Sequence, residues 1–172
     1  MTKPNAFICG SFNPVHLGHL SIALYLHNKG YEPVFEISYE NCDKPDITEE
    51  DMRKRISQIN KFGFGCVATH NPFFTQKVDW LNSRKTANLA ESLLHHNKDI
   101  LAIGADTWNR FVSLDTYFGS EELRDYTVNL VYRKLLVFPR PGYEIHKEGF
   151  ELTVAEDFTK VDISSTRIRG EA

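Results

Sequence analysis

The stretch "GSFNPVHLGHL", residues 10–20, carries two histidines three positions apart, and it follows the short apolar run "AFIC". An apolar run followed by helical periodicity predicts a strand that turns into a helix here. Three interpretations of His16 and His19 are open: a metal site, a loop whose histidines face solvent or cap the helix, and a cradle for phosphate groups. The cradle has a physical basis, because a helix N-terminus offers N–H groups to anions and imidazoles three residues apart can donate to the same phosphate.

Zinc sites on helices commonly use histidines at i and i+4 with a third ligand close by, as in H-E-x-x-H. Here the spacing is three, Leu17 and Gly18 stand between the histidines, and the motif holds no glutamate. This pattern disfavours zinc. The dinucleotide fingerprint G-x-G-x-x-G and the phosphate loop G-x-x-x-x-G-K-[ST] are also absent from the chain. A phosphate cradle would instead use Gly10 for close approach of the backbone and Gly18 for close approach of the helix.

A second candidate stretch lies near the other end of the chain, "VDISSTRIRG", residues 161–170. Three hydroxyl residues precede Arg167 and Arg169 there. Taken alone, such a run is typical of a helix cap, and hydroxyls at a helix start can also hold phosphate. Two arginines at this spacing diverge by about 200° on a helix, so we expect only one of them to face a ligand.

Between these stretches, apolar runs alternate with helical patterns, which predicts parallel strands covered by helices on both faces. The expected fold is α/β, a Rossmann-like doubly wound parallel sheet, in a single domain over residues 1–172. Ligands of such sheets bind at the carboxyl ends of strands near the point where strand order reverses, and "GSFNPVHLGH" follows the first strand. We expect strands near 6–9, 33–39, 65–69, 100–105 and 134–138, helices near 17–30, 48–63, 85–96 and 120–132, and a loop with a short helix in 70–84.

Composition limits the classes of function. The 172 residues are 41% hydrophobic, enough for a real core, and the net charge of −3 argues against a general binder of nucleic acid or membranes. Cys9, Cys42 and Cys66 are widely spaced and odd in number, which favours reduced, buried thiols. The sequence predicts neither a signal peptide nor a membrane span, so we expect a cytoplasmic protein.

The two end motifs together resemble the two signatures of the nucleotidyltransferase superfamily. "GSFNP" with "DISSTRIR" is similar to the pattern of nicotinamide and nicotinate mononucleotide adenylyltransferases in particular. "KTANLAESLLHH", residues 85–96, resembles the helix of that family that carries a threonine near the pyridine ring. "AIGADTWNRF", residues 102–111, resembles its Gly-x-Asp segment near adenosine and ribose.

The resemblance implies transfer of AMP from ATP to the phosphate of nicotinamide or nicotinate mononucleotide, with release of pyrophosphate and formation of a dinucleotide of the NAD type. A phosphate is already an anion at neutral pH, so this chemistry needs positioning and charge stabilisation rather than a base. Mg²⁺ would be carried with ATP, held by phosphate oxygens and water, without dedicated metal ligands in the protein. The expected partners are ATP and a small mononucleotide or other phosphorylated acceptor, and a homo-oligomer stays open.

The resemblance also assigns roles to residues. The catalytic groups would be His16, His19 and Arg169. The nucleotide would be bound by Gly10, Ser11, Phe12, Gly18, Gly104, Asp106, Ser164, Ser165 and Thr166. The acceptor would be bound by Asn13, Lys44, Arg55, Trp80, Thr86, Trp108 and Arg140.

Ordinary structural roles stand beside these assignments. Asp106 can cap the helix that follows its strand, and a tryptophan is more often a core residue than a platform for a ring. Arg55 lies on a highly charged helix, which favours a solvated surface charge. The same alternative applies to Lys44 and Arg140.

Two other functions remain as alternatives. The first is a different nucleotidyltransferase, a cytidylyltransferase or a phosphopantetheine-type adenylyltransferase, because several branches of the superfamily share both signatures. The second is a nucleotide-binding protein without turnover. It is suggested by the stop three residues after Arg169, where the resembling adenylyltransferases continue into a further helix.

Overall fold

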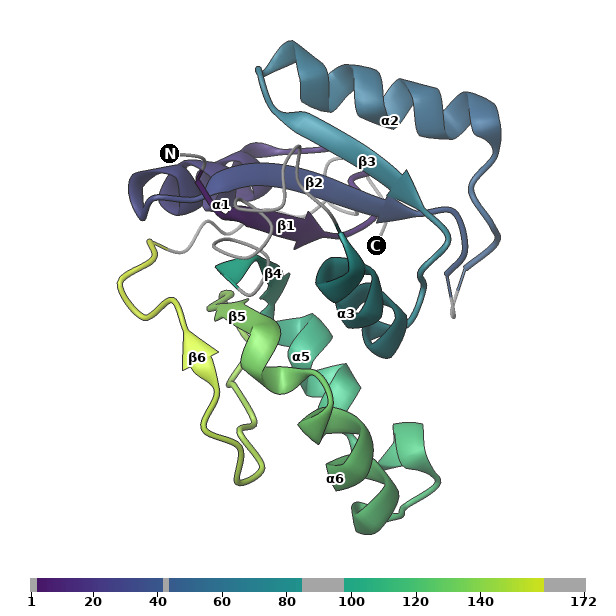
Figure 1. Ribbon diagram of the computed structural model, residues 1–172, viewed down its shortest axis with the longest axis vertical. Coiled ribbons are helices and arrows are strands. Elements are labelled where there is room, and N and C mark those ends of the chain that lie inside the picture. Colours follow the sequence, from purple (N-terminus) through teal and green to yellow (C-terminus); the bar gives the residue numbers. More distant parts are fainter. Residues whose placement is uncertain (1–2, 42–43, 85–97, 160–172) are drawn as a thin grey trace.

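The computed structural model describes residues 3–41, 44–84 and 98–159, and its centre is a parallel sheet in the order β3-β2-β1-β4-β5-β6 (Figure 1). The strands are β1 (Asn5–Cys9), β2 (Glu32–Ser38), β3 (Gly65–Thr69), β4 (Ile100–Gly104), β5 (Leu135–Phe138) and β6 (Thr153–Val154). The helices are α1 (Leu17–Asn28), α2 (Glu49–Lys61), α3 (Phe74–Ser83), α5 (Ala105–Val112) and α6 (Glu121–Asn129), with short 3-10 helices at Leu114–Tyr117 and Tyr132–Lys134.

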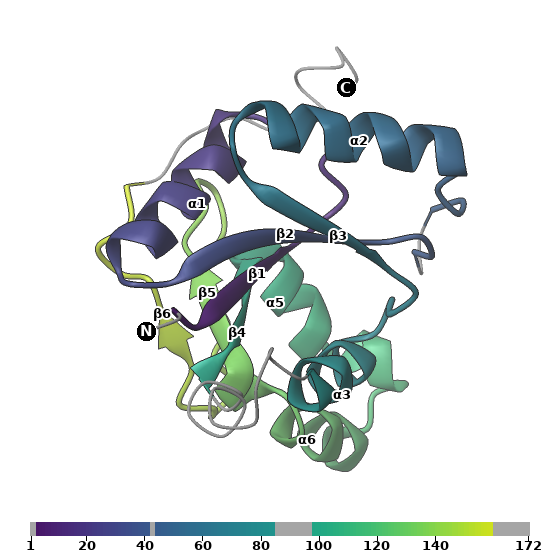
Figure 2. The ribbon, with the colours of Figure 1, turned by 45° about the horizontal axis from the view of Figure 1, so that its top comes forward.

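The expected α/β architecture is confirmed. Helices α1 and α2 lie on one face of the sheet and α3, α5 and α6 on the other, as the two views of Figures 1 and 2 agree. Each face has its own apolar core. One contains Leu26 and Met52, and the other contains Leu81 and Trp108.

Strand β1 lies at the point where the strand order reverses. It pairs in parallel with β2 on one edge and with β4 on the other. From β1 the chain proceeds outward to β2 and β3, then returns to the opposite edge of β1 and proceeds outward through β4, β5 and β6. The crevice at the carboxyl ends of β1 and β4 is therefore the place where such a fold binds ligands.

The predicted elements are found within a few residues of their expected ends. The exceptions are α5 and β6, whose bounds the sequence analysis does not predict, and the helix expected at 85–96, which lies outside the described residues. Helix α5 begins at Ala105 directly after β4, so no loop separates the two patterns. Strand β6 has only two residues, too few to form a periodic signal.

A buried ion pair ties α3 to the sheet. Lys77 Nζ lies 2.5 and 2.8 Å from the two carboxylate oxygens of Glu36 on β2, and both side chains are buried. Burial raises the pKa of the Glu36 carboxyl, and the ammonium of Lys77 and the hydroxyl of Thr69 oppose that rise. Removing either partner would leave an uncompensated charge in the interior, which is strongly destabilising.

Cys9 and Cys66 are free, half-buried thiols, and burial raises the pKa of each. The third cysteine, Cys42, lies outside the described residues. Within the described ranges, no helix is long and apolar enough to cross a bilayer.

Candidate functional site

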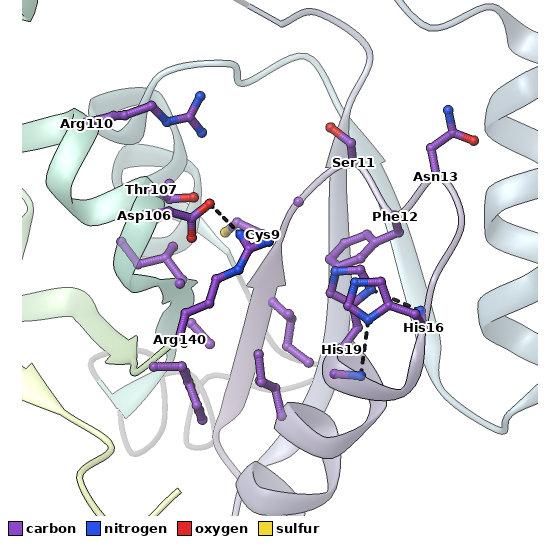
Figure 3. Close-up of a pocket in the computed structure, with 18 of the residues that line it drawn as sticks. Cys9, Ser11, Phe12, Asn13, His16, His19, Asp106, Thr107, Arg110 and Arg140 are labelled. Carbon is purple, nitrogen blue, oxygen red and sulfur yellow. Dashed lines mark hydrogen bonds and ion pairs between the residues drawn. The ribbon is translucent and has the colours of Figure 1, made fainter. Parts of the chain in front are cut away.

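A cleft of about 850 Å³ opens at the carboxyl ends of β1 and β4, where the topology predicts a ligand site (Figure 3). One wall is the segment from Gly10 to His19, which joins β1 to α1. The opposite wall comes from the start of α5 and from the segment that follows β5. Twelve of the residues proposed from the sequence line this cleft: Gly10, Ser11, Phe12, Asn13, His16, Gly18, His19, Lys44, Arg55, Gly104, Asp106 and Arg140.

His16 and His19 build the N-terminus of α1 from their own side chains. His16 is the N-cap residue, and its Nδ1 accepts a hydrogen bond from the Gly18 N–H at 3.1 Å. His19 Nδ1 accepts one from the His16 N–H, also at 3.1 Å. The two rings stack with centroids 3.6 Å apart. The capping role considered for these histidines is thus present, and it fixes the orientation of both rings in the cleft wall.

These bonds also determine where the ring protons lie. A ring nitrogen that accepts an N–H bond carries no proton, so the neutral form of each ring is protonated at Nε2. Burial lowers the pKa of His16, and Arg140 adds to the effect. Burial, then the charges of His16 and Arg140, lower the pKa of His19 to about 3. At neutral pH both imidazoles are therefore uncharged Nε2–H donors, and among the described residues neither Nε2 has a protein partner.

The Phe12 ring packs against the His19 ring. The φ of Phe12, 47°, lies in the left-handed region, and its buried ring meets the His19 ring edge to face at 4.8 Å. A Cβ atom at Gly10 would stand 2.9 Å from Cζ of Phe12, so only glycine leaves room for this ring. The strand-to-helix segment is thus shaped around the position of one imidazole.

Arg55 is not the solvated surface charge that its helix suggested. It is half buried, its Nη1 donates to the Ser11 carbonyl at 3.1 Å, and its side chain lines the cleft. That bond ties α2 to the loop after β1. Lys44 and Asn13 also line the cleft, and both are exposed.

The opposite wall is organised by an ion pair. Arg140 Nη1 donates to Asp106 Oδ2 at 2.7 Å, and the Arg140 guanidinium lies 5.3 Å from the centroid of the Tyr143 ring. Asp106 stands in the first turn of α5, where the helix dipole favours a carboxylate. A Cβ at Gly104 would lie 2.8 Å from Asp106 Oδ1, so this glycine allows the carboxylate to approach the strand end.

Both tryptophans pack on the apolar core, as the core alternative expects, and their contact with a pyridine ring stays a prediction. Trp108 is fully buried, and its indole N–H donates to the His146 carbonyl at 2.9 Å. Trp80 packs edge to face against Phe7 with centroids 4.8 Å apart. Neither indole lines the cleft: Trp108 fills the core, and the half-buried Trp80 packs against the same core.

The sequence analysis missed three polar side chains of the opposite wall: Thr107, Arg110 and Tyr143. The first two lie on α5, on the same side as Asp106 (Figure 3). Their spacing places them on one helical face, a signal that would have been visible had α5 been predicted. Tyr143 has no comparable local signal, since its position depends on how its loop packs.

Five proposed residues lie outside the described part of the chain: Thr86, Ser164, Ser165, Thr166 and Arg169. The meeting of the two end motifs at one triphosphate therefore stays a prediction. Over the described ranges, no group of three or more His, Cys, Asp or Glu side chains gathers as a metal site would require.

Comparison with known proteins gives a consistent result. The sequence model described as cytidylyltransferase-like matches residues 7–171. A protein of Bacteroides thetaiotaomicron named probable nicotinate-nucleotide adenylyltransferase is 31% identical over 171 residues, covering 93% of this chain and 77% of that protein. The protein of the same name from Bacteroides fragilis is 31% identical over 178 residues, covering 98% and 81%. That of Azobacteroides pseudotrichonymphae is 29% identical over 172 residues, covering 94% and 83%.

Proposed function

Because the chain belongs to the cytidylyltransferase-like family of nucleotidyltransferases, we propose that it transfers AMP from ATP to the phosphate of a pyridine mononucleotide and releases pyrophosphate. Nicotinate mononucleotide is the preferred acceptor and nicotinamide mononucleotide the second, in line with the names of the relatives. The observation that carries the proposal is the pair of uncharged Nε2–H donors at the start of α1, held by their own Nδ1 bonds.

The paired imidazoles suit this reaction because they are donors of fixed position. An acceptor phosphate attacks the α-phosphate of ATP, the bond to the leaving pyrophosphate breaks, and negative charge spreads over the oxygens between them. Donors already aimed at those oxygens need no reorganisation during the reaction. Neutral rings also keep their protons, so His16 and His19 act as hydrogen-bond donors and not as acids.

The remaining cleft residues fit the two substrates. Lys44 and Arg55 supply positive charge for the acceptor phosphate, and Asp106 supplies a carboxylate for ribose hydroxyls at the end of β4. Ser164, Ser165, Thr166 and Arg169 would hold the outer phosphates of ATP, as the second signature implies. Arg169 would then stabilise the negative charge of the departing pyrophosphate.

Mg²⁺ fits a site of this composition, because this ion commonly takes phosphate oxygens and water as ligands and needs few protein groups. When bound with ATP it neutralises phosphate charge. We expect chelation to abolish turnover, added Mg²⁺ to restore it, and the thermal midpoint to stay nearly constant, since the ion accompanies the nucleotide and not the fold.

The test pairs ATP or CTP with each of four acceptors: nicotinate mononucleotide, nicotinamide mononucleotide, phosphopantetheine and glycerol phosphate. Pyrophosphate release and the mass of the product are measured for every pair. The proposal expects release with ATP and a pyridine mononucleotide. Pyrophosphate release with CTP but not with ATP would favour a cytidylyltransferase, to which the family description also points. Calorimetric binding of ATP with no release from any pair would identify a binding protein without turnover.

A further inference from the structure

A second cavity of about 570 Å³ adjoins the cleft along α5 and the segment after it. Within the described residues, three side chains line both hollows: Asp106, Arg110 and Tyr143. A ligand in the cleft that extends past the end of β4 would meet these three side chains next. The junction therefore has room for a ring and a substituent beyond the ribose and phosphate.

The three side chains offer different surfaces. Asp106 is engaged by Arg140, so its charge is largely compensated within the protein. Arg110 stands one helical turn after Asp106 and extends from the same side of α5 toward the cleft (Figure 3). Tyr143 contributes an aromatic side chain to the junction, and this residue is 47% exposed. A guanidinium and an accessible aromatic ring thus border the same space.

We propose that Arg110 is a specificity-determining residue of the acceptor site, which selects a planar aromatic ring bearing a carboxylate over the same ring bearing a carboxamide. This inference rests on the proposed function, because it concerns the acceptor of that reaction. Tyr143 is the neighbouring ring-binding residue, which contacts either acceptor and does not discriminate between them.

The discrimination follows from donor and acceptor chemistry. A guanidinium presents parallel N–H groups that match the two oxygens of a carboxylate, and the bond is charge-assisted. A carboxamide offers one oxygen, and its NH₂ group faces a side chain that has only donors. Because Arg110 is an exposed residue, solvent screens part of this difference, and we expect a preference of about tenfold.

The experiment compares Arg110→Gln with Arg53→Gln. Both changes remove one arginine charge, but Arg53 is an exposed residue of α2 that lines neither hollow. The measured quantity is the ratio of kcat/KM for nicotinate mononucleotide to kcat/KM for nicotinamide mononucleotide, together with the Kd of each nucleotide by calorimetry. Arg110→Gln should lower the nicotinate preference about tenfold, both in the kcat/KM ratio and in the ratio of affinities, because the nicotinate nucleotide alone binds less well. Arg53→Gln should leave both ratios unchanged.

Two further variants separate selection from general binding. Arg110→Lys should keep part of the preference, because an ammonium retains the charge but not the two-pronged geometry. Tyr143→Ala should weaken both nucleotides by a similar factor and leave the ratio intact. Added salt should reduce the preference of the unmodified protein and not that of Arg110→Gln.

An unchanged ratio in Arg110→Gln, with transfer still proceeding, would overturn the inference and leave the proposed function standing. Absence of transfer to either nucleotide in the unmodified protein would instead overturn the proposed function. In that case the calorimetric comparison still decides the inference, since equal affinities of the unmodified protein for the two nucleotides would refute selection by Arg110.

Discussion

The two walls of the cleft are built in different ways. In the wall from Gly10 to His19, called here the near wall, the hydrogen bonds that orient the two imidazoles join residues two or three positions apart. In the far wall, formed by Asp106, Thr107, Arg110, Arg140 and Tyr143, the ion pair joins residues 34 positions apart. The orientation of the two imidazoles is thus specified by one short stretch of sequence, whereas the far wall exists only once the segment after β5 has packed on α5.

That packing rests on three hydrogen bonds from two neighbouring residues. Trp108 donates to the His146 carbonyl, Asn109 Nδ2 donates to the Glu144 carbonyl at 2.6 Å, and Asn109 Oδ1 accepts from the His146 N–H at 2.9 Å. Changes in the near wall should therefore affect chemistry directly, and changes in the far wall should affect acceptor binding through position.

The largest effect is expected from His19→Gln. Glutamine can still accept the N–H bond of the N-cap residue, so the helix start is preserved, but the Nε2–H donor is lost. We expect kcat to fall by about 10²-fold or more. His27→Gln, at the exposed end of the same helix, is the matched control for steady-state kinetics. Equal kcat values in the two variants would remove the near wall from the chemistry.

A smaller effect is expected when the far-wall ion pair is broken. Asp106→Asn and Arg140→Gln should each lower kcat/KM for the acceptor by about tenfold, because each leaves the other group without its partner. The double variant should be little worse than either single one, since the two residues act as a unit. Full additivity of the two losses would show that the pair does not operate as one element.

Loosening the far wall without touching its lining should have a milder effect. Asn109→Ala removes two hydrogen bonds to the segment 144–146 and should lower the free energy of unfolding by about 1–2 kcal/mol. We expect the acceptor KM to rise a few-fold and the ATP KM to stay constant. Asn129→Ala on the exposed end of α6 is the control. A rise in the ATP KM alone would mean that the two walls are not independent.

The smallest effect is a pH dependence of the free energy of unfolding, which arises from His19 in the near wall. The folded-state pKa of His19 is about 3 against 6.5 for the free side chain, so the unfolded chain takes up a proton first as pH falls. Stability from this group is complete above about pH 6.5 and is lost as pH falls toward 3. Between pH 7 and pH 6 the loss is about 0.7 kcal/mol.

Urea denaturation of the unmodified protein and His19→Gln at both pH values measures this contribution as a difference, which cancels the other titrating groups. The unmodified protein should lose more stability on acidification than the variant. The reverse order would contradict the neutral, Nδ1-accepting state of His19.

Sequence analysis located the near wall because the residues that orient its two imidazoles belong to one motif. Gly10, His16 and His19 were identified there, although the spacing alone did not distinguish capping from ligand binding, and the structure shows the capping bonds. The helical pattern of α2 suggested a surface charge at Arg55, because its reach to the Ser11 carbonyl depends on how α2 lies over the sheet.

The far wall was only partly predictable. Asp106 and Arg140 were proposed, but their ion pair was not, since residues so far apart in sequence give no local signal of contact. Trp108 was considered as a platform for a ring, yet its indole N–H meets a carbonyl of the segment after β5 and the ring fills the core. Arg110 was missed because α5 starts without a loop after β4.

The central position of β1 has a consequence for how the cleft arises during synthesis. Of the strands in this sheet, the first to be synthesised is the one that both halves share. Residues up to β3 can pair into a half-sheet with the near wall already attached, while the other edge of β1 still exposes unpaired backbone groups. Arrival of β4 and β5 covers that edge and brings the far wall with it. The nascent chain thus acquires the near wall of the cleft before the far wall.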